Sequence, residues 1–448
     1  KPVVPEGFDN LTIGVQGQEQ HGKPYFKPGD PTKPIDENVP PKFIVNGQPT
    51  DETTIPAKTP EGKEIGTYTI NPQTGVITFT PTDKSYVGAV QPATVQRQDI
   101  NGTTVDAEYT PVIVGVKPTA KPATSEDVQG ATQKQPITFI GGTADLEDPA
   151  GKKVESAPVP INPDSVTLLG EDGQPANEVE VKDPKNPTKV IGKYTLVKES
   201  GKDPVAVYTP TDKTYVGSVP PVTIQAADTN GTTVKTTYTP NITPVKPTAT
   251  PAKTTDIQGK AQTGLPEFKG GTVTVNGVLK TVEIDETKAP KLLDPETGEP
   301  TDEPVVIPGE GTYTIEDGKV KFQPEPQFTG KGEGVEVQRV DKNGTPVTAK
   351  YTPKVVPVTP TGEDETSVGP KGQTQKGTPV FNGGSVKING KEQTVEIDKN
   401  VPAKLIDPKT GDPVDSVTVE GEGTYTIDPK TGEVTFKPEP EFLGTATG

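Results

Sequence analysis

The run Gly66-Thr67-Tyr68-Thr69-Ile70 indicates a β-strand, because its side chains alternate in character at every residue. In an extended chain the tyrosine and the isoleucine point to one face and the two threonines point to the other. After a turn at residues 71–75, Ile77 and Phe79 again alternate with threonines. This period-2 pattern predicts a hairpin of two strands with one buried face.

The same run returns three more times along the chain. It stands at residues 192–196, 311–315 and 423–427, with only conservative changes. The spacing of about 110–130 residues is too long for a solenoid repeat of about 20–50 residues, so each unit is the size of a domain. Two further markers recur in order: Asn-Gly-Thr at Asn101, Asn230 and Asn343, and Tyr-Thr-Pro at Tyr109, Tyr238 and Tyr351.

Short joints rich in Pro, Thr and Lys separate the units. They include Lys117-Pro118, Lys246-Pro247 and Thr359-Pro360. Such segments favour an extended, polyproline-like backbone and act as semi-rigid spacers, with a floppy linker as the alternative. We predict repeat domains at residues 1–117, 118–246, 247–359 and 360–448. The fourth has no Asn-Gly-Thr or Tyr-Thr-Pro block, so we expect it to be C-terminally truncated and to lack its final hairpin.

The turns between the alternating segments have the chemistry of β-hairpins. Asp317-Gly318 suits a type I′ turn, and Asn71–Gly75 suits a type I turn that ends in a left-handed glycine. The Asn-Gly pairs of the second marker are expected to be type I′ as well. No segment has a 3.6-residue apolar stripe. The sequence predicts an all-β protein, a tandem array of β-sandwich-like domains that forms an elongated rod.

Composition excludes several classes of function. The chain has no Cys and one histidine, His21, which removes thiol catalysis, Cys/His zinc sites and most Ser-His-Asp sites. Its formal charge of −17 argues against nucleic acids and anionic membranes as partners. No apolar run approaches the ~20 residues of a membrane span. We therefore predict a protein that is not an enzyme, with no cofactor and no catalytic, cofactor-binding or metal site.

Candidate binding residues each have a simpler interpretation. Asp99, Asp228 and Asp341 open segments that resemble the start of a calcium loop, but position 12 from Asp341 is Thr352 instead of a closing Glu. A hairpin turn explains these segments, and it also explains their match to the N-glycosylation pattern. His21 is expected at the surface without a function.

Three other sets of residues could carry a special role. Arg97 and Arg339 occupy equivalent strand positions, for which no special role is expected. Lys-Asn or Lys-Asp isopeptide crosslinks would need a lysine, an Asn or Asp, and an acid that meet inside an apolar core, and no motif singles out such a trio. The recurring tyrosines could contact a ligand in every unit, but a core this poor in Leu and Phe needs each ring. We therefore expect buried aromatics at Tyr68, Tyr194, Tyr313 and Tyr425.

The ordered set of motifs resembles the repeats of streptococcal fibrillar surface adhesins of the CshA type. The most specific stretches are Gly264–Gly271 and Gly377–Gly384, which share the pattern Pro-x-Phe-x-Gly-Gly. Unit one departs from it at Pro28-Gly29-Asp30, and unit two carries an insertion near residues 183–193. The resemblance covers the whole chain.

The resemblance implies an extracellular, cell-wall-anchored protein of a Gram-positive bacterium. Its repeats would build surface fibrils that serve adhesion and biofilm formation, and host binding would lie in a non-repetitive region outside this chain. The expected function is a structural stalk that projects an adhesive tip. Its partners would be neighbouring repeats of the same chain, with host matrix or other bacteria contacted through outside regions. The alternative is a multivalent array whose repeats themselves grip a host glycoprotein or glycan.

Overall fold

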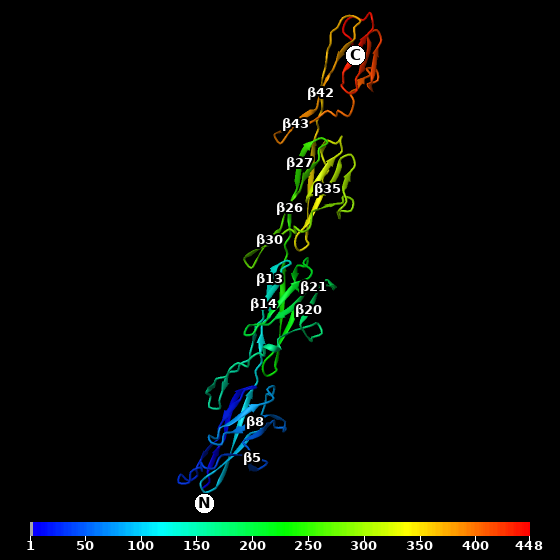
Figure 1. Ribbon diagram of the computed structural model, residues 1–448. Helices are drawn as coiled ribbons and strands as arrows, with labels where there is room; N and C mark the ends of the chain where they lie inside the picture. The colour runs from blue at the N-terminus through cyan, green and yellow to red at the C-terminus, as the bar shows by residue number, and fades with distance from the viewer. Residues whose placement is uncertain (1–2) are drawn as a thin grey trace. The chain divides into compact units, whose positions relative to one another are not determined.

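The computed structural model describes residues 3–448, which form strands and loops apart from one short 3-10 turn, η1 (Pro163–Ser165). The strands build three β-sandwiches in chain order and a fourth, partial set (Figure 1). The chain divides into two compact units. One runs to Val245 and includes Val273–Lys280, and the other comprises Lys246–Thr272 and Thr281–Gly448. The prediction of tandem all-β sandwiches is confirmed, and the exact domain limits stay a prediction.

The first sandwich packs a five-stranded sheet, β2-β11-β10-β5-β6, against a four-stranded sheet, β3-β9-β8-β7. β2 and β11 run parallel, and the other neighbours are antiparallel. A short ladder, β1-β4, accompanies them. The strands are β1 (Glu6–Phe8), β2 (Asn10–Val15), β3 (Gln20–Gly22), β4 (Tyr25–Lys27), β5 (Lys42–Val45), β6 (Gln48–Thr50), β7 (Thr54–Lys58), β8 (Glu64–Ile70), β9 (Ile77–Pro81), β10 (Ala93–Gln98) and β11 (Thr104–Val114).

The second sandwich repeats this topology, with sheets β13-β25-β24-β18-β19 and β14-β22-β21-β20. It adds the hairpin β16-β17, for which the first sandwich has no counterpart. Its strands are β12 (Thr119–Ala120), β13 (Ala123–Val128), β14 (Gln133–Pro136), β15 (Phe139–Ile140), β16 (Leu146–Glu147), β17 (Lys153–Val154), β18 (Thr167–Leu169), β19 (Pro175–Ala176), β20 (Glu178–Asp183), β21 (Asn186–Val197), β22 (Val205–Pro210), β23 (Gly217–Ser218), β24 (Val222–Ala227) and β25 (Thr233–Thr243).

The third sandwich has the same two sheets, β27-β39-β38-β32-β33 and β28-β36-β35-β34, and the extra hairpin β30-β31. Its strands are β26 (Thr248–Thr250), β27 (Ala252–Ile257), β28 (Gln262–Gly264), β29 (Glu267–Lys269), β30 (Gly271–Val275), β31 (Val278–Val282), β32 (Lys291–Leu293), β33 (Pro300–Thr301), β34 (Val305–Ile307), β35 (Gly311–Glu316), β36 (Lys319–Pro324), β37 (Gly330–Lys331), β38 (Val335–Val340) and β39 (Pro346–Val356).

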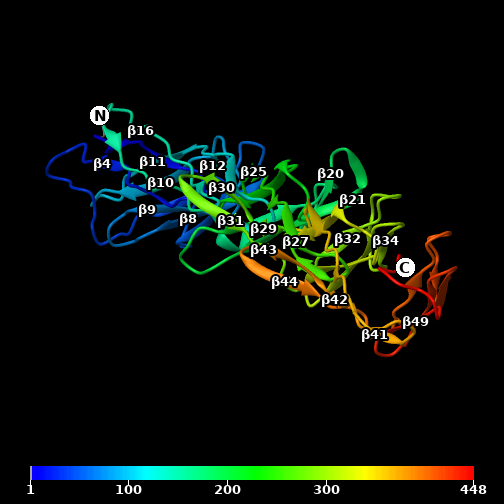
Figure 2. The same ribbon diagram turned by 90° about the horizontal axis from the view of Figure 1, so that it is seen from above.

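The fourth set keeps only one of the two large sheets, β41-β49-β48-β47. No described residue after β49 is in a strand, so β38 and β39 have no counterparts here. The hairpin β43-β44 follows β42 and lies away from β41 and β49 (Figure 2). The strands are β40 (Thr361–Glu363), β41 (Gln375–Gly377), β42 (Val380–Asn382), β43 (Gly384–Ile388), β44 (Lys391–Val395), β45 (Leu405–Ile406), β46 (Pro413–Val414), β47 (Ser416–Val419), β48 (Gly423–Ile427) and β49 (Val434–Pro438).

The alternation of side chains seen in the sequence agrees with the pairing of β8 and β9 in the structure. Tyr68 pairs with Phe79 and Ile70 pairs with Ile77 across β8 and β9, and all four side chains are buried. Tyr194 and Tyr313 are buried at the same position, 1% and 0% exposed, so the expected core role is confirmed for three of the four tyrosines. Tyr425 is only half-buried, because no second large sheet covers it.

A second set of tyrosines ties the two sheets together through buried polar groups. The Tyr109 hydroxyl lies 2.7 Å from the Thr12 hydroxyl, which donates to Gln20 Oε1, and Gln20 Nε2 donates to the Val112 carbonyl. Tyr109 and Thr12 belong to one sheet and Gln20 to the other. The same chain of bonds recurs with Tyr238, Ser125 and Gln133, and with Tyr351, Thr254 and Gln262.

The Asn-Gly-Thr turns are hairpin turns, but the expected type I′ geometry is wrong. A type I′ turn needs positive φ at both central residues, and only the glycine has it, for example Gly102 at +79°. The cause is the preceding aspartate. Asp99 Oδ1 accepts the backbone N–H groups of Asn101 and Thr103, which stabilises a turn with a single left-handed residue at its end. Asp228 and Asp341 do the same.

We predict that Tyr313→Ala strongly destabilises the third sandwich. The ring is fully buried, and deleting a buried aromatic costs about 3–5 kcal/mol. Hydrogen exchange on the full chain should show lost protection in strands β27 to β39 and unchanged protection in the first sandwich. Tyr313→Phe is the control: it keeps the ring and loses only the hydroxyl that donates to Glu310 Oε2, so it should cost less. Unchanged protection in Tyr313→Ala would contradict a core role.

We also predict that the folded chain unfolds at alkaline pH. Burial raises the pKa of Tyr109 to about 12, and it raises the pKa of Tyr68 and Tyr194 further. A folded-state pKa above the ordinary value of 10.0 means that stability is complete below pH 10 and falls as the pH rises toward the folded value. Circular dichroism and tyrosinate absorbance should therefore change together above pH 10. Ionisation of all tyrosines near pH 10 with the β signal intact would contradict it.

Candidate functional site

The residues singled out from the sequence do not form a reactive site. Among residues 3–448, no three His, Asp or Glu side chains are grouped so that they could hold a metal ion. His21 is exposed, with Nδ1 2.9 Å from Thr78 Oγ1. Every lysine in the described part of the chain is at least partly exposed, so no trio for an isopeptide crosslink is assembled in a core. The same residues include no helix long and apolar enough to cross a membrane.

Arg97 and Arg339 have a structural role that the sequence analysis missed. Arg97 donates to Glu37 at 3.1 Å and Arg339 donates to Glu286 at 3.0 Å. Each arginine side chain is only 13% exposed, whereas each glutamate is largely exposed. The pairs fasten the loops before β5 and before β32 to the neighbouring strands. Because the glutamate of each pair is open to water, these ion pairs contribute little to stability.

The joint between the first two sandwiches lies within one compact unit and is built from both of them. Val15 ends β2, Val116 lies in the linker, and Leu146 and Val159 come from the hairpin region of the second sandwich. The four side chains form one buried cluster, each no more than 6% exposed. Linker residues alternate in burial: Val116 and Pro118 are buried, and Lys117 between them is exposed. The linker is therefore part of an apolar interface.

Gln16 fixes the linker to the first sandwich. Its Oε1 accepts the backbone N–H of Val116, and its Nε2 donates to the carbonyls of Lys84 and Ser85. The side chain is 4% exposed, so it makes these bonds away from water. Buried polar groups need such partners, since an unpaired one costs ~1–3 kcal/mol. Gln16 thus joins three segments that are far apart in the sequence.

Asn230 of the second sandwich closes the joint from the other side. Its Nδ2 donates to the Gln16 carbonyl at 2.9 Å, and the side chain is 6% exposed. Gly17, at φ +79°, lies directly against it, and a Cβ there would be 1.9 Å from Asn230 Oδ1. A neighbouring bond runs from Gln18 Nε2 to the Ala157 carbonyl at 3.1 Å. The Asn-Gly-Thr turn of one sandwich therefore contacts the Gln-Gly turn of the preceding one.

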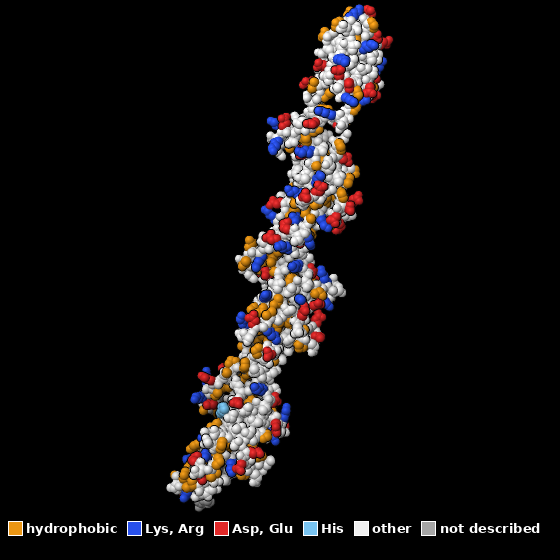
Figure 3. Space-filling view, viewed as in Figure 1, with side chains coloured by type: hydrophobic (Ala, Val, Ile, Leu, Met, Phe, Trp, Pro, Cys, Tyr) orange, Lys and Arg blue, Asp and Glu red, His pale blue; other side chains and the backbone are white. Residues whose placement is uncertain are grey.

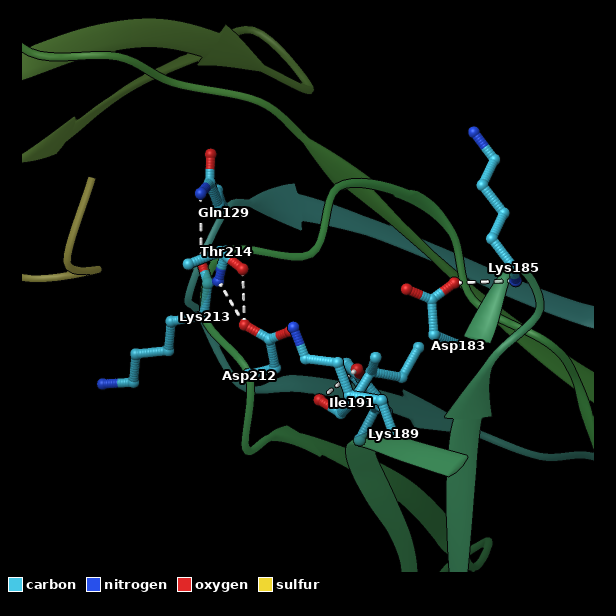
Figure 4. A network of polar contacts seen from close by, with 9 residues as sticks. Gln129, Asp183, Lys185, Lys189, Ile191, Asp212, Lys213 and Thr214 are labelled. Atoms are coloured by element: carbon cyan, nitrogen blue, oxygen red, sulfur yellow. Dashed lines mark hydrogen bonds and ion pairs between the residues drawn. The ribbon is translucent and has the colours of Figure 1, made fainter. Parts of the chain in front are cut away.

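Equivalent glutamines hold the segments that follow the second and third sandwiches. Figure 4 shows Gln129, whose Nε2 donates to the Lys213 carbonyl at 2.9 Å beside the Lys189–Asp212 ion pair. Its Oε1 accepts the N–H of Val245. In the other unit, Gln258 Oε1 accepts the N–H of Val358 and its Nε2 donates to the Pro326 carbonyl. The same clamp thus occurs three times.

The extra hairpins lie against the preceding sandwich in each compact unit. Lys280 on β31 is 4.0 Å from Asp127 on β13. Lys260 Nζ, just after β27, is 3.4 Å from Gln393 Oε1 on β44, and β43 lies against β27. In the second sandwich this hairpin supplies Leu146 to the buried cluster. The first sandwich has the loop 28–34 at this place and lacks the hairpin.

Sequence comparison places the chain in a family. The family described as surface adhesin CshA repetitive domain matches residues 2–113, 115–242, 244–355 and 357–448. The chain belongs to this family. The resemblance seen in the sequence is confirmed, and it is a family of adhesin repeats and not of enzymes. Membership implies a cell-surface location. The comparison with curated proteins found no match.

Several solved structures of tandem domains are similar to the chain at low identity. An I-band fragment of titin is 9% identical over 79% of this chain and 98% of its own, with a TM-score of 0.29. Extracellular cadherin domains 3–6 of protocadherin gamma B2 are 12% identical over 98% of this chain and 92% of their own, with a TM-score of 0.28. The human desmocollin-1 ectodomain is 12% identical over 98% and 74%, with a TM-score of 0.24.

We predict that Gly17→Ala loosens the joint between the first two sandwiches. The new Cβ would clash with Asn230 in a conformation that already disfavours a side chain. Gly102→Ala is a matched control in the same sandwich: its φ is also +79°, and its Cβ would meet nothing within 4 Å. Hydrogen exchange of the Val116 amide should rise in Gly17→Ala and stay unchanged in Gly102→Ala. Removing the clashing side chain in Gly17→Ala/Asn230→Ala should partly restore protection. Equal behaviour of the two glycine variants would contradict the role of this contact.

Proposed function

We propose that the chain is a stalk segment of a bacterial surface adhesin, which projects an adhesive region away from the cell wall. The observation that carries the proposal is the joint, because a stalk must resist bending between its domains. Val116 of the linker is buried and its N–H is bonded to Gln16, and Asn230 of the second sandwich donates to the Gln16 carbonyl. A flexible tether would instead expose its linker to water.

Family membership supports the finer parts of the proposal. Repeats of a surface adhesin belong outside the cell, and the resemblance to fibrillar streptococcal adhesins favours a Gram-positive cell wall and a role in biofilms. The first two repeats contact each other at the joint, so neighbouring repeats of the same chain are the partners that we propose. Contacts with host matrix or other bacteria would be made by regions outside this chain.

The surface shows the even charge pattern that suits a stalk. Acidic and basic side chains are interspersed on the face seen in Figure 3, without an extended patch of one sign. The net charge of −17 would keep neighbouring arrays apart. Repulsion between like-charged fibrils and local mixing of signs both oppose lateral association.

The binding-array alternative would need an exposed aromatic or apolar patch in every repeat. In the first sandwich Phe8 and Tyr25 are exposed, and their rings lie 5.7 Å apart. The corresponding positions in the third sandwich are Thr250 and Glu267, which pair in the same register. The aromatic pair is thus not repeated there, and the stalk is the better supported function.

Solution scattering and binding measurements on the purified chain test the proposal together. A compact globule of this length would have a radius of gyration of about 22 Å, and an unfolded chain about 78 Å. For a stalk we expect an intermediate radius with the constant cross-section of a rod, and no saturable binding to extracellular matrix glycoproteins or glycans. A compact or coil-like curve would refute the stalk. Saturable binding that is lost when Phe8 and Tyr25 are replaced by alanine would favour a binding role for the repeats.

A further inference from the structure

In each of the three sandwiches, the second strand pairs in parallel with the last strand. In the first sandwich β2 pairs with β11 over six positions, from Asn10 with Tyr109 to Val15 with Val114. The pairs β13–β25 and β27–β39 have the same six-position parallel register. The chain therefore enters and leaves each sandwich on neighbouring strands that run in the same direction.

This parallel pairing determines how a pulling force along the chain acts on a sandwich. The preceding segment pulls on β2 at Asn10, and the following segment pulls on β11 at Val114, at the opposite end of the pair. The two strands are thus pulled past each other along their length, so the six paired positions resist together. Antiparallel terminal strands would have both attachment points at the same end and would separate one pair at a time.

The parallel ladder is lengthened at the end where the chain leaves the sandwich. The backbone N–H of Gln16 donates to the Val114 carbonyl at 2.8 Å, and Gln16 Oε1 accepts the N–H of Val116. Gln129 and Gln258 make the equivalent backbone bonds to β25 and β39, both at 2.9 Å. The departing linker is therefore bonded to the residue that directly follows the entering strand.

Side chains join the same two strands a second time. The Tyr109 hydroxyl on β11 lies 2.7 Å from the Thr12 hydroxyl on β2. Thr12 donates to Gln20, and Gln20 Nε2 donates to the Val112 carbonyl on β11. Tyr109 is fully buried and Gln20 is 5% exposed, so these bonds are stronger than they would be at the surface. Equivalent networks join β13 to β25 and β27 to β39.

We propose that each sandwich acts as a tensile clamp, in which the parallel pair of terminal strands bears a pulling force transmitted along the chain. This is resistance to extension, whereas the joint between the first two sandwiches resists bending. Forced unfolding is governed by the unfolding rate, so the force that a sandwich withstands depends on the barrier to separating these two strands. The short ladder β1-β4 has three pairs and precedes the clamp, so it should open first. The clamp follows from the strand pairing alone, and its use as the tether of an adhering cell rests on the proposed stalk function.

Optical tweezers on the full chain test the clamp. The chain has no cysteine, so pulling handles can be attached at pairs of introduced ones. With handles at Val4→Cys and Lys117→Cys, both exposed positions, the force shears β2 against β11. With handles at Val4→Cys and Thr104→Cys, both attachment points lie at the same end of the pair, and the force peels β2 away. At one loading rate we expect a clearly higher unfolding force in the shearing geometry.

The length released identifies the element that fails. Residues 10–114 span 105 positions, so their release should lengthen the tether by about 330–360 Å, the extended length less ~17 Å for the folded strand pair. Handles at Lys121→Cys and Lys246→Cys load the second sandwich in the same way. Its clamp encloses residues 123–243, which span 121 positions, so the step should be about 55 Å longer, at a comparable force.

Two conservative variants separate the clamp from general stability. Thr12→Val removes the hydroxyl between Tyr109 and Gln20, and it should lower the shearing force. Ile77→Val changes the buried core of the other sheet, so it should lower the stability to denaturant and leave the shearing force unchanged.

Two results would overturn the proposal: a shearing force no higher than the peeling force, or an equal loss of shearing force in the two variants. The comparison of the two geometries needs neither variant, so it decides the matter even if Thr12→Val does not fold. A compact or coil-like scattering curve would refute the stalk and leave the measured force unaffected. Failure of the clamp and failure of the stalk are thus distinguishable.

Discussion

The hydroxyl chain that begins at Tyr109, Tyr238 and Tyr351 holds each complete sandwich together. A chain with only 29% hydrophobic residues and no Cys, Met or Trp has little apolar volume with which to join two sheets. Each tyrosine contributes a buried ring, and its hydroxyl continues through a Ser or Thr to a glutamine of the opposite sheet. All members of this network are bonded, which is the condition for a buried polar group to stabilise a core. The network also specifies register, since a slip of one residue would turn the tyrosine outward.

One five-residue segment of the first sandwich contributes both to the core and to the joint. In Gln16-Gly17-Gln18-Glu19-Gln20, the last glutamine belongs to the core network and the first clamps the linker. The glycine between them takes a left-handed turn against Asn230 of the next sandwich. The orientation of the joint is thus set by residues that the fold of the first sandwich already holds in place. Bending this joint would require breaking bonds of the Gln16 clamp, whose acceptors are backbone groups of the sandwich.

The sequence predicts those parts of the structure that depend on neighbouring residues. Tyr68 and Ile70 alternate with threonines, and their hairpin partners Phe79 and Ile77 lie one turn away, so both strands and the buried face could be predicted. The Asn-Gly turns were assigned the wrong type because the side chain of Asp99 outweighs the intrinsic preference of the pair. The clamp was missed because Gln16 and Val116 are a hundred residues apart and a polar residue carries no hydrophobic signal. The recurrence of Gln-Gly at residues 16, 129 and 258 was the available clue.

The partial fourth set shows how the two sheets differ in their dependence on distant residues. Strands β47, β48 and β49 follow one another and pair as two local hairpins, and they adopt the arrangement of the complete sandwiches without a covering sheet. The other large sheet depends on parallel pairing such as that of Ala252 with Tyr351, which must close a loop of nearly the whole domain. Loop closure of this length costs entropy before any contact repays it, so local hairpins form more readily than the parallel pair. We therefore expect the local sheet to form first, and the tyrosine on the last strand then to cover it and complete the hydroxyl chain. That strand also leads directly into the linker. Completion of one sandwich therefore also positions the start of the next one.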